Sequence, residues 1–217
     1  MIKAIIFDFD GVIVESVDIK TKAFAKLFCH EGPAVAEAVV EYHLQNSGVS
    51  RFDKFAYIYN NILHRRITEA IFNDLCNKFS QLVVNEVINA PYVEGAEEFL
   101  KEYVKEYKFF VVSATPQEEI ESIIEKRGMS GCFSTVYGAP GKKTDLVRKI
   151  IKDNSLTSRE LIYIGDALSD YEAAKENSVE FIARINNNSH LFDDKLSCLK
   201  VKNLINLKNI LENISKI

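Results

Sequence analysis

The sequence of 217 residues contains no long basic run, and its formal net charge is −4. Proteins that bind nucleic acid need concentrated positive charge, so nucleic acid is not an expected partner. The apolar start at Ile5 is interrupted by Asp8 and Asp10. It is therefore neither a signal peptide nor a membrane span, and we expect no membrane partner.

Cysteine and histidine patterns that hold disulfides or zinc are also missing. The cysteines are scattered and form no CxxC pair; they are Cys29, Cys76, Cys132 and Cys198. The four histidines form no HxH or HxxxH pair, so each is expected in the core or at the surface rather than in a zinc site. Scattered cysteines are typical of a reducing compartment, and we expect buried thiols in a cytoplasmic protein.

The spacing of apolar residues divides the chain into segments with two different secondary-structure patterns. Residues 17–88 show only helical patterns: a helix over 17–28, a second up to about Gly48, a third through residues 52–63, and a fourth after an N-cap at Thr68 with Ile71, Leu75, Leu82 and Val83 on its inner face. Pro91 ends this block. Residues 17–88 are therefore expected to form a helical insertion.

The rest of the chain alternates strands and helices. Strands are expected at 3–9, 109–113, 134–137, 161–164 and 179–183, and helices at 95–107, 116–127, 144–152, 170–176 and 205–214. This order predicts an α/β fold: a doubly wound parallel-sheet core of residues 1–16 and 89–217, with the all-helical segment 17–88 inserted in it. Ligands of such sheets bind at the carboxyl ends of the strands.

Two carboxylates stand at the end of the first strand, in the stretch IIFDFDGVIVES. Asp8 and Asp10 are two residues apart, so on a strand they point to the same side. Burying two carboxylates is costly unless a cation neutralises them, and Mg²⁺ bound through oxygen ligands fits that need. The alternative is a strand-to-turn junction in which Asp and Gly11 are only turn formers.

The other strand ends supply groups that complement these carboxylates. They are Ser113 and Thr115, then Lys142 and Lys143, then Asp166 and Asp170. Carboxylates, a hydroxyl and a lysine at one edge of a sheet are the set used in phosphoryl transfer to an aspartate.

These motifs resemble the haloacid dehalogenase-like hydrolase superfamily, in the branch with a helical cap inserted after the first motif. DFDGV is similar to its first motif, FFVVSAT with Ser113 to its second, and GDALSD with Asp166 and Asp170 to its fourth. The third motif departs from the family, because GKKTD stands where many members carry KPxPD. The phosphate lysine is then Lys143 or Lys142, and we favour Lys143 because it immediately precedes a helix N-terminus.

The resemblance implies a Rossmann-like core and a role for each motif residue. Asp8 would be the nucleophile and Asp10 the general acid and base. Ser113 and Lys143 would bind the phosphate. Mg²⁺ would be held by Asp8, the main-chain carbonyl of Asp10 and Asp166, with Asp170 as a further ligand or as an orienting group. Dehalogenases of the superfamily lack an aspartate at the position of Asp10, because a halide leaving group needs no proton, so Asp10 argues for phosphate esters.

Several residues keep plainer interpretations. Thr115 is expected to cap the helix that follows, in the box Thr115-Pro-Gln-Glu118. Ser113 could be an ordinary strand-end hydroxyl. Arg51 could grip a second anionic group of the substrate, or lie in a helix-start loop capped by Ser50. The stretch from Gly138 to Thr144 contains the glycine and lysine residues typical of a P-loop, but their spacing does not match the motif GxxxxGK[ST]. A kinase or ATPase is therefore not expected.

The leading hypothesis is a Mg²⁺-dependent phosphatase that hydrolyses a small phosphorylated metabolite through an aspartyl-phosphate, similar to phosphoglycolate phosphatases. A mutase resembling β-phosphoglucomutase shares every motif. A phosphonate hydrolase would need a cap lysine as a Schiff base, for which Lys20, Lys22 and Lys26 are available. A catalytically silent binding module on the same scaffold is the alternative of another class.

Overall fold

The computed structural model describes residues 1–185, 192, 196 and 198–215. Its centre is a parallel sheet of six strands in the order β3-β2-β1-β4-β5-β6. The strands are β1 Ala4–Phe7, β2 Lys108–Pro116, β3 Thr135–Ala139, β4 Leu161–Gly165, β5 Glu180–Arg184 and β6 Leu199–Val201. The strand order reverses beside β1, which places the end of β1 at the switch point where such sheets bind ligands.

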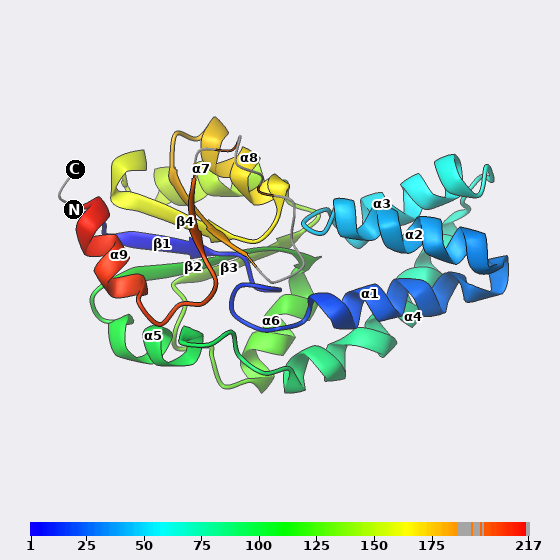
Figure 1. Ribbon diagram of the computed structural model, residues 1–217, viewed down its shortest axis with the longest axis horizontal. Coiled ribbons are helices and arrows are strands. Elements are labelled where there is room, and N and C mark those ends of the chain that lie inside the picture. Colours follow the sequence, from blue (N-terminus) through cyan, green and yellow to red (C-terminus); the bar gives the residue numbers. More distant parts are fainter. Residues whose placement is uncertain (186–191, 193–195, 197, 216–217) are drawn as a thin grey trace.

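Helices cover both faces of this sheet (Figure 1). One face carries α5 Ala96–Tyr103, α6 Gln117–Lys126 and α9 Leu207–Ile214, and the other carries α7 Lys143–Asp153 and α8 Leu168–Glu176. Successive strand residues point to opposite faces, so Ile5 and Phe7 join one apolar cluster while Ala4 and Ile6 join the other. The Rossmann-like α/β core predicted from the alternating pattern is confirmed.

The helical segment extends away from one end of the sheet (Figure 1). It consists of α1 Val17–Phe28, α2 Pro33–Gln45, α3 Arg51–Tyr57 with a π-helical turn at Ile58–Ile62, and α4 Glu69–Asn89. Aromatic rings from three of its helices meet in its interior, where Phe24 contacts both Phe55 and Phe79. Thr68 accepts a hydrogen bond from the backbone of Ile71 at the start of α4, as predicted. Short 3-10 turns lie at Cys29–Glu31 and Ser158–Glu160.

Some element boundaries differ from the sequence prediction. The helix expected to reach Tyr107 ends at Tyr103. The strand expected to end at Ser113 continues to Pro116, because Pro116 pairs with Ala139 of β3. Strand β6 was not expected, since three residues are too few to show an alternating pattern.

Two burial predictions were wrong. Ile71 was expected on the inner face of α4, but it is 38% exposed beside an open groove near Leu75. The thiols were expected to be buried, but Cys29 is exposed and the other three are half-buried. Among the described residues, no helix is long and apolar enough to span a membrane.

Candidate active site

The carboxyl end of β1 turns sharply and brings three aspartates together. Parallel pairing continues through Asp8, whose backbone N–H donates to the carbonyl of Ile164 at 2.9 Å. At Gly11 the backbone has a φ of +77°, and a Cβ there would lie 2.8 Å from the Cγ of Asp166. Only glycine allows this turn, which keeps the loop after β1 against the loop after β4.

A buried ammonium group joins Asp8 to Asp170. Lys143, at the first position of α7, donates from Nζ to Asp8 Oδ2 at 2.9 Å and to Asp170 Oδ1 at 2.6 Å. Tyr163 on β4 donates to the same Asp170 oxygen at 2.6 Å, and the backbone N–H of Ala167 donates to the other at 3.1 Å. The structure therefore places Lys143 beside Asp8, whereas Lys142 is exposed to solvent.

The pKa values of this cluster show an excess of negative charge. Burial raises the pKa of Asp8 to about 7, with Lys143 opposing and Asp170 and Asp10 adding to the shift. Burial and the neighbouring Asp8 and Asp170 raise the pKa of Asp166 well above its ordinary value. For Lys143, burial acts to lower the pKa, but the two adjacent carboxylates outweigh it and raise the pKa.

A divalent cation fits this charge excess. Asp8, Asp166 and Asp170 each offer a carboxylate oxygen, and these atoms all lie within 4.8 Å of one another. Carboxylate oxygens are the ligands that Mg²⁺ prefers. Asp170 already accepts three hydrogen bonds from Lys143, Tyr163 and Ala167, so its geometry suits an orienting group more than a ligand.

Asp10 lies in the same cavity as Asp8 but has separate partners. Ser16 Oγ donates to its Oδ1 at 2.6 Å, and Thr115 Oγ1 donates to its Oδ2 at 3.1 Å. The ammonium group of Lys20, from α1 of the helical segment, is paired with that same Oδ2. Burial acts to raise the pKa of Asp10, but Lys20 and the hydroxyl donors outweigh it and lower the pKa, so Asp10 is held as a carboxylate.

The prediction that Thr115 caps α6 was wrong. That helix begins at Gln117, and its N-cap position, Pro116, has no capping side chain. Because β2 continues past Ser113, Thr115 lies on the strand and its hydroxyl faces Asp10. Ser113 is buried, and its Oγ accepts a hydrogen bond from the backbone N–H of Thr115 at 3.1 Å. The phosphate-binding role of Ser113 stays a prediction.

The helical segment closes over these residues and leaves a cavity of about 20 Å³. Asp8, Asp10 and Asp166 line it from the core, and Lys20, His43 and Ser47 line it from the helical segment. Sequence reasoning missed the last two. His43 is buried, in agreement with the expected core or surface position, but its lone place in the sequence gave no sign that it would line the cavity.

Arg51 was considered as a grip for a second anionic group of the substrate, and the structure gives it a different partner. Its guanidinium is paired with the carboxylate of Glu119 on α6, where Nη1 lies 3.0 Å from Oε2. Ser80 on α4 accepts from Arg51 at 2.7 Å and donates to Glu119 at 2.6 Å. This buried pair joins the helical segment to the core. The alternative expectation, that Ser50 caps the helix start, is confirmed, since Ser50 accepts from Asp53 N.

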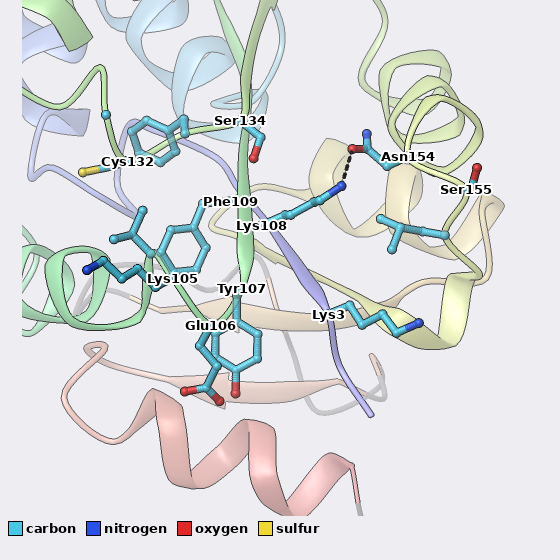
Figure 2. A pocket seen from close by; sticks show the side chains of 14 residues that line it. Lys3, Lys105, Glu106, Tyr107, Lys108, Phe109, Cys132, Ser134, Asn154 and Ser155 are labelled. Carbon is cyan, nitrogen blue, oxygen red and sulfur yellow. Dashed lines mark hydrogen bonds between the residues drawn. The ribbon is translucent and has the colours of Figure 1, made fainter.

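A larger hollow lies at the opposite edge of the sheet (Figure 2). It measures about 500 Å³ and is lined by Lys3, Glu106, Lys108 and Ser134, which stand at the amino ends of the strands. Lys108 reaches across it to Asn154. None of the carboxylates described above lines this hollow, so its size does not make it the active site.

A family model for haloacid dehalogenase-like hydrolases matches residues 5–184 of this chain. The chain belongs to the haloacid dehalogenase-like hydrolase family. The match begins at β1 and ends at β5, so it includes Asp8, Asp10, Lys143 and Asp166 together with the whole helical segment. A search of curated proteins found none that matches.

Solved structures with the same fold cover nearly the whole chain. A β-phosphoglucomutase from Clostridium difficile has 19% identity and a TM-score of 0.79, with 100% of this chain and 98% of that one covered. A predicted phosphoglycolate phosphatase from Haemophilus somnus has 16% identity and a TM-score of 0.74, covering 97% and 98%. A haloacid dehalogenase-type hydrolase from Bacillus subtilis, bound to magnesium, has 13% identity and a TM-score of 0.72, covering 97% and 99%. At these identities the likeness shows the fold: a Rossmann-like core with a helical cap.

Proposed function

We propose that this hydrolase is a Mg²⁺-dependent phosphatase that acts on a small organic phosphate monoester through an aspartyl-phosphate. The observation that carries the proposal is the pair Asp8 and Asp10, which line one cavity with opposite electrostatic surroundings. A carboxylate that attacks phosphorus and one that moves protons need such different environments. The magnesium-bound relative of the same fold is consistent with this proposal.

In the first step the Asp8 carboxylate attacks phosphorus and the bond to the ester oxygen breaks. Lys143 orients Asp8 and neutralises charge beside it. The resemblance places Ser113 as a further phosphate donor. Asp8, the main-chain carbonyl of Asp10 and Asp166 would hold Mg²⁺, which would supply positive charge that offsets the repulsion of the anionic phosphate by Asp8. The leaving oxygen takes its proton from Asp10. This requires that the ammonium group of Lys20 move from Asp10 to the substrate phosphate, and that Asp10 then bind a proton from solvent before the ester bond breaks.

In the second step water hydrolyses the aspartyl-phosphate. Asp10 takes a proton from the attacking water, and its lowered pKa keeps it in the carboxylate form that a base needs. Thr115 and Ser16 hold this carboxylate in place through hydrogen bonds of 3.1 and 2.6 Å. Asp8 is then released for the next turnover.

We also propose that residues 1–16 and 89–217 form the catalytic core and that residues 17–88 form a cap that selects the substrate. Residues 216–217 lie outside the described part of the chain. The contacts of Lys20 and His43 with the cavity support the role of the cap. The free cysteines are consistent with a cytoplasmic enzyme. The partner of the proposed phosphatase would be a small phosphorylated metabolite.

The pairing of Arg51 with Glu119 supports a phosphatase over a mutase. A mutase must hold a substrate with two phosphates, and Arg51 was the cap cation that could bind a second anionic group, the alternative being a helix-start loop capped by Ser50. In this structure that guanidinium is occupied. The deciding experiment incubates the protein with β-glucose 1-phosphate, a trace of glucose 1,6-bisphosphate and Mg²⁺. Free phosphate is expected to form faster than glucose 6-phosphate; the reverse order would replace our proposal by the mutase.

The phosphatase itself is tested with p-nitrophenyl phosphate. We expect phosphate release in the presence of Mg²⁺ and its loss in excess EDTA, with recovery when Mg²⁺ is added back. A folded protein that releases no phosphate from this ester or from a panel of phosphorylated metabolites would be a binding module instead. Activity that persists in EDTA would contradict the metal site.

A further inference from the structure

The cap contains a buried lysine that pairs with no carboxylate among the residues that the structure describes. Lys54 on α3 is 1% exposed, and its Nζ lies 2.8 Å from His43 Nδ1 and 3.3 Å from the carbonyl oxygen of Ser47. Burying an amine inside the cap is costly. What the lysine does structurally is to hold two cavity-lining residues, His43 and Ser47, at fixed positions.

The contact with Lys54 decides which nitrogen of His43 carries the proton. Lys54 donates to the Ser47 carbonyl, and its Nζ lies 2.8 Å from His43 Nδ1. We infer that Nζ also donates to Nδ1, which places the ring proton on Nε2. Burial and the nearby Lys54 and Lys20 lower the pKa of His43 to about 2, which keeps the ring neutral. The ring is also stacked on Phe24, with 4.6 Å between ring centroids. The Nε2–H donor is therefore rigidly placed.

Two polar atoms at this cavity have no partner. Within the described residues, buried His43 Nε2 and buried Ser47 Oγ make no hydrogen bond. Both residues line the cavity that also contains Asp8 and Asp10. A buried donor without a partner is destabilising, and a protein that holds two of them beside a reactive carboxylate has them available for a ligand.

We propose that His43 Nε2–H and Ser47 Oγ–H bind an acceptor oxygen on the leaving group of the substrate. The inference rests on the proposed phosphatase function and narrows its substrate class. The site would take small phosphate monoesters that carry a hydroxyl, carbonyl or carboxylate oxygen near the ester, and it would discriminate against purely apolar leaving groups. The cavity of about 20 Å³ holds little more than one water, so small leaving groups require the smallest outward shift of the cap.

The test compares two esters that differ by one oxygen, 2-hydroxyethyl phosphate and ethyl phosphate. The measured quantity is the ratio of their kcat/KM values in the presence of Mg²⁺. Because both values come from one preparation, the ratio does not depend on the fraction of protein that is folded. For the wild type we expect a ratio of about 10 to 100 in favour of the hydroxyethyl ester, since a site with unpaired donors rejects an analogue that lacks the acceptor.

The variants Ser47→Ala and His43→Phe each remove one donor, and we expect each to lower this ratio by about tenfold. His43→Gln restores an N–H donor, so its ratio is expected to recover toward that of the wild type. Leu44→Ala is the matched control, because Leu44 is the neighbour of His43 on α2 and is exposed away from the cavity. Its ratio is expected to equal that of the wild type.

A wild-type ratio near one, or a ratio unchanged in both donor variants, would overturn the inference and would leave the two donors as water-binding groups. Those outcomes still require phosphate release from both esters, so the phosphatase proposal would survive them. If the phosphatase proposal itself were wrong, the wild-type protein would release no phosphate from any ester in the presence of Mg²⁺.

Discussion

Asp8 and Asp10 are two residues apart, yet their surroundings pull their acidities in opposite directions. Burial, with Asp170 and Asp10 adding to it, leaves Asp8 with a raised pKa despite Lys143. Asp10 receives one ammonium group and two hydroxyl donors, and its pKa is lowered. The difference arises because Asp8 stays within the sheet edge, whereas Asp10 lies in the turn that meets the cap. These surroundings suit a nucleophile that a metal neutralises and a separate proton carrier.

Replacement of the nucleophile is the most direct prediction. We expect Asp8→Asn to lower kcat by roughly a thousandfold or more, about 4 kcal/mol of barrier, because an amide cannot accept the phosphoryl group. The fold is expected to survive, since the change removes a buried charge. Turnover of p-nitrophenyl phosphate and the circular dichroism spectrum are measured together. Near-normal turnover would contradict covalent catalysis by Asp8.

The two adjacent lysines provide a matched pair of variants. Lys143 is buried between two carboxylates, while Lys142 is exposed. We expect Lys143→Ala to abolish phosphatase activity and to destabilise the metal-free protein by about 3 kcal/mol, since it leaves buried charges unpaired. Lys142→Ala is expected to change neither property. Urea unfolding and phosphate release measure both. If Lys142→Ala is the inactive variant, the third motif has been aligned one residue too late.

The loop between α2 and α3 is the element through which the cap meets the core. Gly48 lies against the loop after β4, where a Cβ would come 2.6 Å from the Cβ of Ala167 and closer still to the side chain of Ser169. The loop therefore approaches the loop that follows Asp166 as closely as a backbone allows. His43 and Ser47, which precede Gly48 in the chain, line the cavity in this arrangement.

A side chain at Gly48 is expected to hold the cap open. We predict that Gly48→Val lowers kcat/KM by about a hundredfold, because a displacement of about 1 Å at the reacting groups costs that much. The free energy of unfolding is expected to change less than the activity, since the aromatic packing of Phe24, Phe55 and Phe79 inside the cap does not involve Gly48. Gly131→Val is the control, because a Cβ at Gly131 meets no atom within 4 Å. Equal activities of the two variants would show that this close approach is not needed.

The molecule as a whole concentrates carboxylates at one edge of its sheet and relies on few cations to balance them. Asp8, Asp10, Asp166 and Asp170 gather there, and Lys20 and Lys143 are the ammonium groups in direct contact with them. In the absence of a metal, the raised pKa values of Asp8 and Asp166 favour proton uptake, which reduces the excess negative charge. Metal binding is therefore expected to stabilise the folded protein, apart from its effect on activity.

Thermal unfolding measures this stabilisation. With Mg²⁺ at a hundred times its Kd we expect a rise of about 5 to 10 °C in Tm, which corresponds to about 2.7 kcal/mol in a chain of this size. The raised pKa values of Asp8 and Asp166 mean that protons compete with the metal, so the rise shrinks as the pH falls toward 5. Asp166→Asn removes a ligand and a buried charge. It is expected to show little Mg²⁺ response without losing stability; a full wild-type response would exclude Asp166 from the metal site.

Local sequence patterns were sufficient for the architecture. Helix α1 was predicted at Val17–Phe28, where the structure places it, because an amphipathic stripe on a helix depends on residues three and four apart. The strands were recognised because a sheet buried on both faces requires continuous apolar runs. The rule that parallel sheets bind ligands at their carboxyl edge then directed attention to Asp8, Lys143 and Asp166, and the structure brings these three together.

The sequence by itself determined the core fold and the charged residues of the strand ends, since each depends on neighbours a few positions away in the chain. Only the tertiary structure decided what faces those residues. The roles of Thr115, His43 and Arg51 were open or misjudged because their partners are 105, 11 and 68 residues distant in the sequence. Contacts between cap and core depend on how elements distant in the sequence pack together, and no periodicity of a single helix or strand encodes that packing.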